Sequence, residues 1–138
     1  MTTAIHPARL LHEPLPVVFT AQSACTAFMR HHICKFVLEQ GRVPINPFMS
    51  FGYFLLDSVP RDSIRQANNT LLQKADELWT FGVIADGVLE EIRLARKARI
   101  PVKHFSLGKN MESIVRLEPG DLEYEQGVAK LEELAANF

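Results

Sequence analysis

The residues of this sequence best suited to chemistry are two neighbouring glutamates, Glu90 and Glu91. The apolar spacing of residues 86–98 predicts a helix, on which adjacent side chains point about 100° apart. With Val88 at zero on the helical wheel, Glu91 falls at roughly 300°, inside the apolar arc, and Glu90 at roughly 200°, beside Arg93. Glu90 is therefore expected on a solvated face. A carboxylate in an apolar arc finds a partner or shifts its pKa, which makes Glu91 a candidate for nucleophilic or acid–base chemistry.

Two structural alternatives stay open for Glu91: a shorter or rotated helix, or a carboxylate that caps a buried backbone amide. The common glycine-rich nucleotide loops, the Gly-x-Ser-x-Gly turn, Cys-x-x-Cys and His-Glu-x-x-His are all absent from the sequence. The adjacent His31 and His32 diverge by about 100° on a helix, so they cannot chelate one ion. We therefore expect neither a metal site nor a cofactor.

Length and composition favour one small domain. The chain has 138 residues, of which 47% are hydrophobic and 22% charged, and its net charge is −1. That charge argues against binding of polymeric nucleic acid, and no apolar run reaches the ~20 residues that a membrane span needs. Cys25 and Cys34 lie too far apart on one predicted helix to pair, which favours a cytoplasmic setting.

Strand and helix patterns alternate along the chain. We predict a loose leader over residues 1–15 and a single domain over 16–138. The predicted strands cover residues 16–20, 43–45, 77–84 and 101–105, and the predicted helices cover 23–40, 61–75, 86–98 and Leu122 to Ala136, with a short helical turn around Met111 to Val115. The apolar stretch 47–56 fits no single element.

This alternation predicts an α/β fold. The expected form is a flavodoxin- or Rossmann-like three-layer sandwich, with a mostly parallel sheet of four or five strands and helices on both faces. Ligands of such sheets bind beyond the carboxyl ends of the strands, which directs attention to Gln22 and Ser23, to residues 46–53 and to residues 85–87.

The ordered set of short motifs resembles the nucleoside 2-deoxyribosyltransferase family and its relatives, the deoxynucleoside 5′-monophosphate N-glycosidases. The resemblance runs from Val17 to Val102. Its parts are Phe19-Thr20-Ala21 on the first strand, Ala75-Asp76 before the third, and Gly87-Val88-Leu89-Glu90-Glu91 followed by Ala95 and Pro101-Val102. As an ordered set the signal is moderately specific, and each piece alone is weak.

The resemblance makes Glu91 the nucleophile that attacks the anomeric carbon of a sugar and forms a glycosyl ester. It places Asp86 and Gly87 near the sugar, Phe19 on the strand-one aromatic position, and Gln22 and Ser23 in the turn beside the ligand. Arg30 is a candidate for a 5′-phosphate or a simple surface cation. Asp76 matches a family position but is equally typical of a turn.

Three departures from the family pattern stand out. The N-glycosidases carry a sugar-contacting Asp where this sequence has Asn68 or Asn69, and Asp62 either supplies the missing carboxylate or pairs with Arg61 on the surface. The phosphate-recognising Ser of the monophosphate-specific relatives falls at Ala85. Residues 47–56 have no counterpart, and Phe48 and Tyr53 there either stack against a base or belong to the core or a subunit interface.

The expected function is cleavage or exchange of the N-glycosidic bond of a nucleoside, deoxynucleoside or nucleotide. The alternative is a nucleotide-binding or sensing module that kept the pocket and lost the chemistry, which Asn68 and Ala85 motivate. A third alternative is an NAD-directed glycohydrolase. The resemblance also implies a homodimer or a dimer of dimers.

Overall fold

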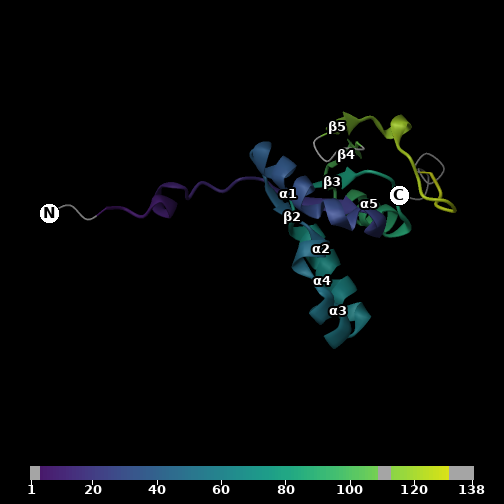
Figure 1. Ribbon diagram of the computed structural model, residues 1–138, viewed down its shortest axis with the longest axis horizontal. Helices are drawn as coiled ribbons and strands as arrows, with labels where there is room; N and C mark the ends of the chain where they lie inside the picture. The colour runs from purple at the N-terminus through teal and green to yellow at the C-terminus, as the bar shows by residue number, and fades with distance from the viewer. Residues whose placement is uncertain (1–3, 109–112, 131–138) are drawn as a thin grey trace.

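The protein is an α/β domain built on one mixed sheet (Figure 1). The computed structural model describes residues 4–108 and 113–130. Within them, five strands lie in the order β2-β1-β3-β4-β5. The first four are parallel and β5 is antiparallel to β4. Their bounds are β1 Val17–Gln22, β2 Val43–Ile45, β3 Glu77–Phe81, β4 Val102–Leu107 and β5 Ile114–Leu117. The predicted α/β class with a mostly parallel sheet is confirmed.

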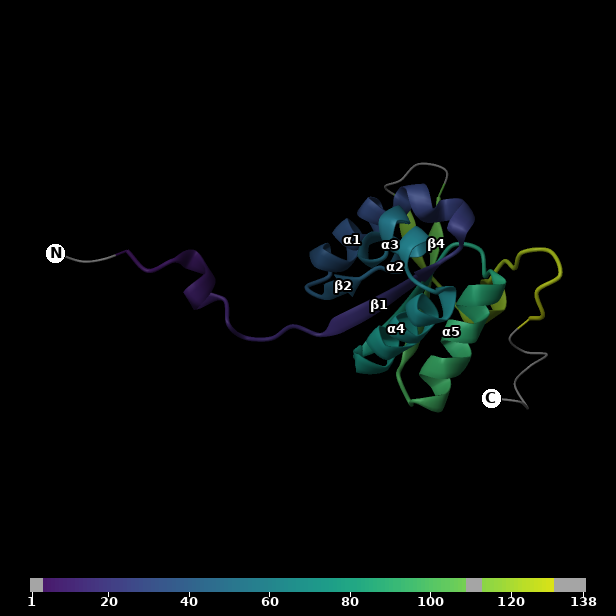
Figure 2. The same ribbon diagram turned by 90° about the horizontal axis from the view of Figure 1, so that it is seen from below.

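Helices cover both faces of the sheet (Figure 2). The 3₁₀ helix η2, Ala24–Met29, leads into α1, Arg30–Glu39, on one face, while α4, Arg61–Lys74, and α5, Asp86–Lys97, cover the other. The remaining short helices are η1 Pro7–Leu10, α2 Pro47–Ser50, α3 Tyr53–Ser58 and η3 Pro119–Asp121. Stretch 47–56 is thus mostly helical.

The boundaries of the first predicted helix follow from its end residues. Ser23 caps η2, because its hydroxyl oxygen accepts a hydrogen bond from the Cys25 N–H. Gly41 ends the run with a φ of 75°, a conformation that favours glycine.

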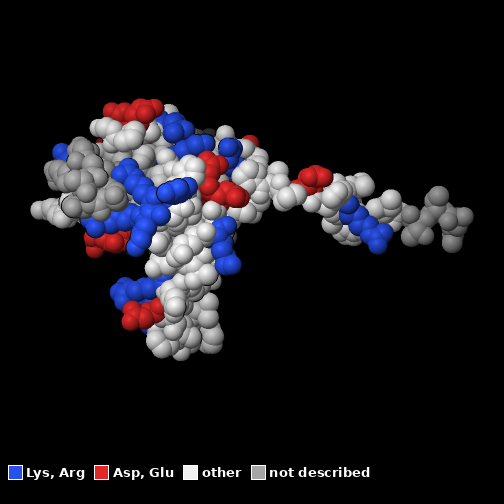
Figure 3. Space-filling model, turned by 180° about the vertical axis from the view of Figure 1, so that it is seen from behind, with Lys and Arg blue, Asp and Glu red and all other residues white. Residues whose placement is uncertain are grey.

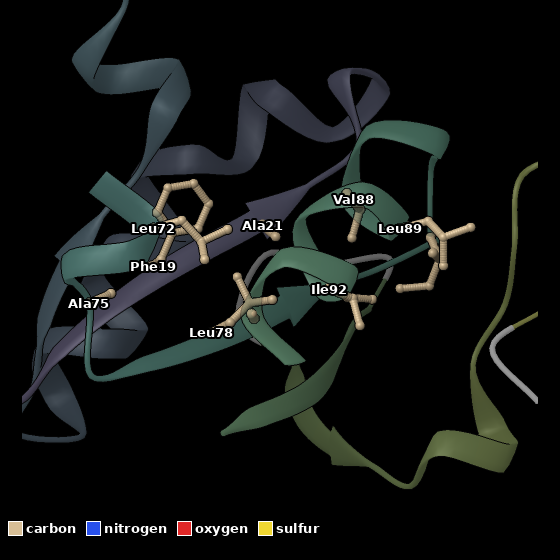
Figure 4. Packing of buried hydrophobic residues seen from close by; sticks show 10 residues of the cluster. Phe19, Ala21, Leu72, Ala75, Leu78, Val88, Leu89 and Ile92 are labelled. Atoms are coloured by element: carbon tan, nitrogen blue, oxygen red, sulfur yellow. The ribbon is translucent and has the colours of Figure 1, made fainter. Parts of the chain in front are cut away.

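The side chains of alternate residues on the central strands pack into two separate hydrophobic cores. Phe19 and Leu78 face α4 and α5, where they pack with Leu72 and Ile92 (Figure 4). Val18 and Trp79 instead belong to the cluster under α1. This period of two is what a sheet covered on both faces requires.

A compact ionic cluster holds the amino-terminal end of the sheet together. Glu77 at the start of β3 lies 2.9 Å from Arg42 and 3.0 Å from Lys103. Both cations lie over the ring of Trp79. Burial alone would raise the pKa of Glu77, but hydrogen bonds from Lys103, Arg42 and Trp79 bring it below its usual range.

The carboxyl-terminal predictions need correction. No helix covers residues 122–130: Tyr124 pairs in parallel with Ile84, and a turn follows at residues 126–127. The rest of the predicted helix lies outside the described residues. The helical turn predicted around Met111 to Val115 is wrong where it can be compared, because β5 begins at Ile114. The third strand ends at Phe81 rather than at residue 84.

Two parts of the chain project from this body. Residues 4–16 are exposed and extend away from the sheet (Figures 1 and 2). Helices α2 and α3 form an arm beside α4 that carries few charged side chains in the space-filling view (Figure 3). Its exposed apolar side chains include Met49, Tyr53, Phe54 and Leu56.

Candidate functional site

Glu91 lies on the inner side of α5, about 7 Å along the helix axis from its first residue. Its side chain is partly buried, and its Oε2 accepts a hydrogen bond of 3.0 Å from Asn68 Nδ2 on α4. Burial raises the pKa of the Glu91 carboxyl to about 7, although the Asn68 hydrogen bond opposes the rise. The neighbouring Glu90 is exposed and lies 3.9 Å from Arg93, as the helical wheel predicts.

Asn68 keeps spare hydrogen-bonding capacity. Its Nδ2 is committed to Glu91, but its buried Oδ1 has no hydrogen-bond partner among the described residues. An unsatisfied buried carbonyl is costly, so a hydroxyl donor that reached this atom would be favoured. The two side chains together offer a carboxylate and an amide oxygen to one ligand.

The start of α5 lies where the chain reverses its direction across the sheet. The connection from β1 to β2 runs through α1 on one face of the sheet. The connection from β2 to β3 runs through α4 on the other face, and β3 lies on the opposite side of β1 from β2. Carboxyl ends on the two sides of such a reversal leave a crevice for ligands. Asp86 and Gly87 open α5 at this position, both exposed, and a Cβ on Gly87 would meet open space.

A buried polar network closes the carboxyl end of β1. Asn46 Nδ2 donates to Thr20 Oγ1 at 3.0 Å and to Gln22 Oε1 at 2.9 Å, and Gln22 Nε2 donates to the Thr26 carbonyl oxygen at 2.7 Å. The predicted site residue Gln22 is therefore fully engaged in holding the turn. Asn46 begins the segment 46–53 that was expected near a ligand, but no role was predicted for its side chain, although an Asn directly before Pro47 is a recognisable helix cap.

Ser23, predicted beside the ligand, is buried and donates a hydrogen bond to Glu125 Oε1. Glu125 comes from the extended carboxyl-terminal segment, 102 positions along the chain. The sequence placed this residue in a helix, so nothing in it indicated the contact. The structure thus adds a second carboxylate at the carboxyl end of β1.

Three predicted site residues have other roles. Phe19 is fully buried among core side chains, so it cannot contact a ligand from outside. Asp62 is exposed and lies 2.9 Å from Arg65, one turn further along α4. Asp76 accepts a hydrogen bond of 2.7 Å from the Val17 N–H at the amino end of β3, the end opposite to the crevice. Phe19 and Asp76 thus make structural contacts, and Asp62 pairs with Arg65 rather than with the expected Arg61.

The remaining predicted site residues lie in different parts of the structure. Arg30 donates to the Ala27 carbonyl oxygen at 2.9 Å. Phe48 and Tyr53 lie on the α2–α3 arm, where Tyr53 is 86% exposed. Asn69 lines a shallow groove of about 270 Å³ on the outer side of α4 and α5, together with Glu90, Arg93, Leu94 and Lys97. Glu91 is not among the residues that line this groove.

In the described part of the chain, no three His, Cys, Asp or Glu side chains lie close enough together to hold a metal ion. Nor does any helix there combine the length and apolar character needed to cross a membrane.

The fold and the site together define an α/β domain with a half-buried carboxylate held by an amide beside the reversal of its sheet. Residues 20–105, more than half of the chain, match the family described as a domain of unknown function, DUF7768. The chain belongs to this family. No curated protein matches the sequence.

Proposed function

We propose that the protein cleaves or exchanges the N-glycosidic bond of a nucleoside, deoxynucleoside or nucleotide, with Glu91 as the nucleophile. The observation that carries this proposal is the pair of Glu91 and Asn68. Glu91 is a half-buried carboxylate with a pKa of about 7, and it is hydrogen-bonded to an amide whose oxygen has no partner among residues 4–108 and 113–130. The resemblance to the nucleoside 2-deoxyribosyltransferase family supports the same assignment.

The strand order supports the finer fold class as well. The order β2-β1-β3-β4-β5 is that of flavodoxin-like doubly wound sheets, in which ligands bind at the β1/β3 reversal. The antiparallel β5 is an edge strand and leaves this reversal unchanged. We therefore place the substrate over the carboxyl ends of β1 and β3.

The proposed reaction proceeds in two steps. The ionised Glu91 attacks the anomeric carbon through Oε1, while Asn68 holds Oε2. The C–N bond breaks, its electron pair leaves with the base, and the base takes a proton from solvent. Water, or the nitrogen of a second base, then attacks the same carbon, the ester bond breaks and the carboxylate is restored, so the configuration is retained. Neither step requires a cofactor.

The test is chromatographic detection of free base from a panel of nucleosides, 5′-monophosphates and NAD, with and without an acceptor base. We expect release by the wild type and a fall of at least about a thousandfold in Glu91→Gln, which keeps the Asn68 contact but lacks the nucleophile. Glu90→Gln is the matched control and should keep full activity. Full activity of Glu91→Gln would refute the mechanism. Saturable nucleotide binding without base release would favour a binding or sensing module, and nicotinamide release would point to an NAD glycohydrolase.

The same proposal includes a homodimer or dimer of dimers. The exposed apolar side chains of the α2–α3 arm support it, since a contiguous apolar surface is typical of subunit interfaces. Light scattering on the wild type and on Phe54→Ser would test the assignment: the variant should have a lower mass, and an unchanged mass would count against the arm.

A further inference from the structure

The carboxyl-terminal segment lies against the reversal of the sheet. The Ile84 N–H donates to the Glu123 carbonyl oxygen at 2.8 Å, and the Glu125 N–H donates to the Ile84 carbonyl oxygen at 3.0 Å. Leu122, Tyr124 and Val128 pack against the core under α5. The backbone of residues 123–125 is therefore fixed beside the residues that connect β3 to α5, and in Figure 2 this segment passes the amino-terminal end of α5.

The Glu125 side chain extends from there to the other side of the reversal. Its Oε1 accepts the hydrogen bond from Ser23, directly after β1, and lies 3.8 Å from Cys25 Sγ. The carboxylate is thus positioned by both strands: its backbone is paired beyond β3, and its side chain is held beyond β1.

Glu125 retains hydrogen-bonding capacity on its outer oxygen. Both side-chain contacts fall on Oε1, and in the described part of the chain Oε2 has no hydrogen-bond partner. A carboxylate has about four acceptor sites, so most of its capacity is unused. The matching ligand groups are donors without negative charge, such as the hydroxyls of a sugar.

The charges near the crevice disfavour an anionic ligand. Asp86 and Glu125 supply two carboxylates at this end of the sheet, and Glu91 lies about one and a half turns further along α5. Asp86 already lies where the partial positive charge of the α5 amino terminus is strongest. Ala85, at the cap position, brings no side-chain donor. Arg30, the cation that the sequence predicted for a phosphate, donates a hydrogen bond to the Ala27 carbonyl oxygen.

We propose that Glu125 binds a ring hydroxyl of the sugar through Oε2, and that the site consequently takes uncharged nucleosides in preference to 5′-monophosphates. This inference rests on the proposed function and names its substrate class. Hydrogen bonds from sugar hydroxyls to a carboxylate strengthen as the oxocarbenium-like charge develops, so Glu125 would contribute to kcat as well as to KM.

The experiment measures kcat/KM for the wild type, Glu125→Gln and Glu123→Gln. Glu123 is the matched control, because it lies on the same segment, is exposed and pairs through its backbone alone. The substrates are one ribonucleoside, its 2′-deoxy and 3′-deoxy analogues and its 5′-monophosphate. Fluorescence of Trp79, which is 2% exposed, verifies that each variant is folded.

We expect the wild type to favour the nucleoside over the monophosphate at least tenfold. Glu125→Gln should lower kcat/KM for the ribonucleoside tenfold or more. For one of the two deoxy analogues the same substitution should lower kcat/KM less than twofold, because that analogue lacks the hydroxyl that Glu125 binds. Glu123→Gln should change every value less than twofold. The inference would be overturned if Glu125→Gln lowered kcat/KM equally for all the substrates or did not lower it at all. A preference of the wild type for the monophosphate would also overturn it.

Failure of the proposed function gives a different pattern. If the wild type releases no base from any substrate, calorimetric titration with the same nucleoside decides the question. At least tenfold weaker binding by Glu125→Gln would support the hydroxyl contact in a non-catalytic site. Equal affinity of the two proteins, or no binding by the wild type, would overturn it.

Discussion

Replacement of Glu91 by glutamine should make the protein more stable at alkaline pH. The pKa of Glu91 is about 7 in the folded protein against 4.5 for an ordinary glutamate. Because the folded pKa is raised, the stabilising contribution is complete below pH 4.5 and is lost as the pH rises through 7. At about 1.4 kcal/mol per pH unit, the ionised carboxylate costs about 3 kcal/mol of unfolding free energy above pH 8. Glutamine keeps the Asn68 hydrogen bond and carries no such cost.

The assay is urea denaturation of wild type and Glu91→Gln at several pH values from 4.5 to 8.5. The protein has a single tryptophan, Trp79, which is 2% exposed, so its emission reports unfolding directly. The difference in unfolding free energy between the two proteins should grow by about 3 kcal/mol across this range in favour of the variant. The exposed Glu90→Gln should show a difference that does not vary with pH. A constant difference for Glu91→Gln would refute the assignment of a raised pKa.

Four further predictions concern other polar side chains. Burial lowers the pKa of His104 to about 4, so stability should be lost as the pH falls from 6.5 to 4, and His104→Gln should remove this slope in acid denaturation. Asn46→Ala leaves two buried acceptors without a donor and should cost about 2–4 kcal/mol in urea denaturation. Asp76→Ala should cost about 1.5–3 kcal/mol, since it removes a carboxylate hydrogen bond, yet leave turnover unchanged. Asn68→Ala should raise the pKa of Glu91 further and move the acid limb of the pH–rate profile upward.

Each of these predictions has an informative contrary result. An unchanged acid slope in His104→Gln would show that the histidine is not the group responsible. The exposed Asn69→Ala is the control for Asn46→Ala and should lie within about 0.5 kcal/mol of wild type. Loss of turnover in folded Asp76→Ala would restore a functional role to this residue. A pH–rate profile that stays in place in Asn68→Ala would separate Asn68 from the titration of Glu91.

The sequence predicted those elements that depend on residues close together in the chain, such as amphipathic helices and their caps. The helix of Glu91 was predicted from its amphipathic spacing, and the same spacing placed Glu91 on the inner face, where it is partly buried. Ser23 and Gly41 marked the ends of the first helical run because caps and left-handed residues have strong type preferences. Asn68 was singled out by the resemblance, and the structure brings it to Glu91.

The features that the sequence did not indicate depend on contacts between residues far apart in the chain. Residues 122–136 are rich in Glu, Leu and Ala, which favour helix, but Tyr124 pairs with Ile84 and Gly127 has a φ of 85°, so tertiary contacts override propensity over the described part. The partner of Ser23 could not be read from the sequence for the same reason. Phe19 was misassigned because an aromatic on a central strand fits a core and a ligand wall equally well.

Ser23 and Glu125 lie 102 positions apart in the chain, so they are also far apart in the order of synthesis. During synthesis, all strands of the parallel part of the sheet emerge before the segment that pairs with Ile84. The contacts of that segment close some of the longest loops in the structure, and the entropy cost of closing a loop grows with its length. The hydrogen bond between Ser23 and Glu125 can therefore form only after all five strands have been synthesised.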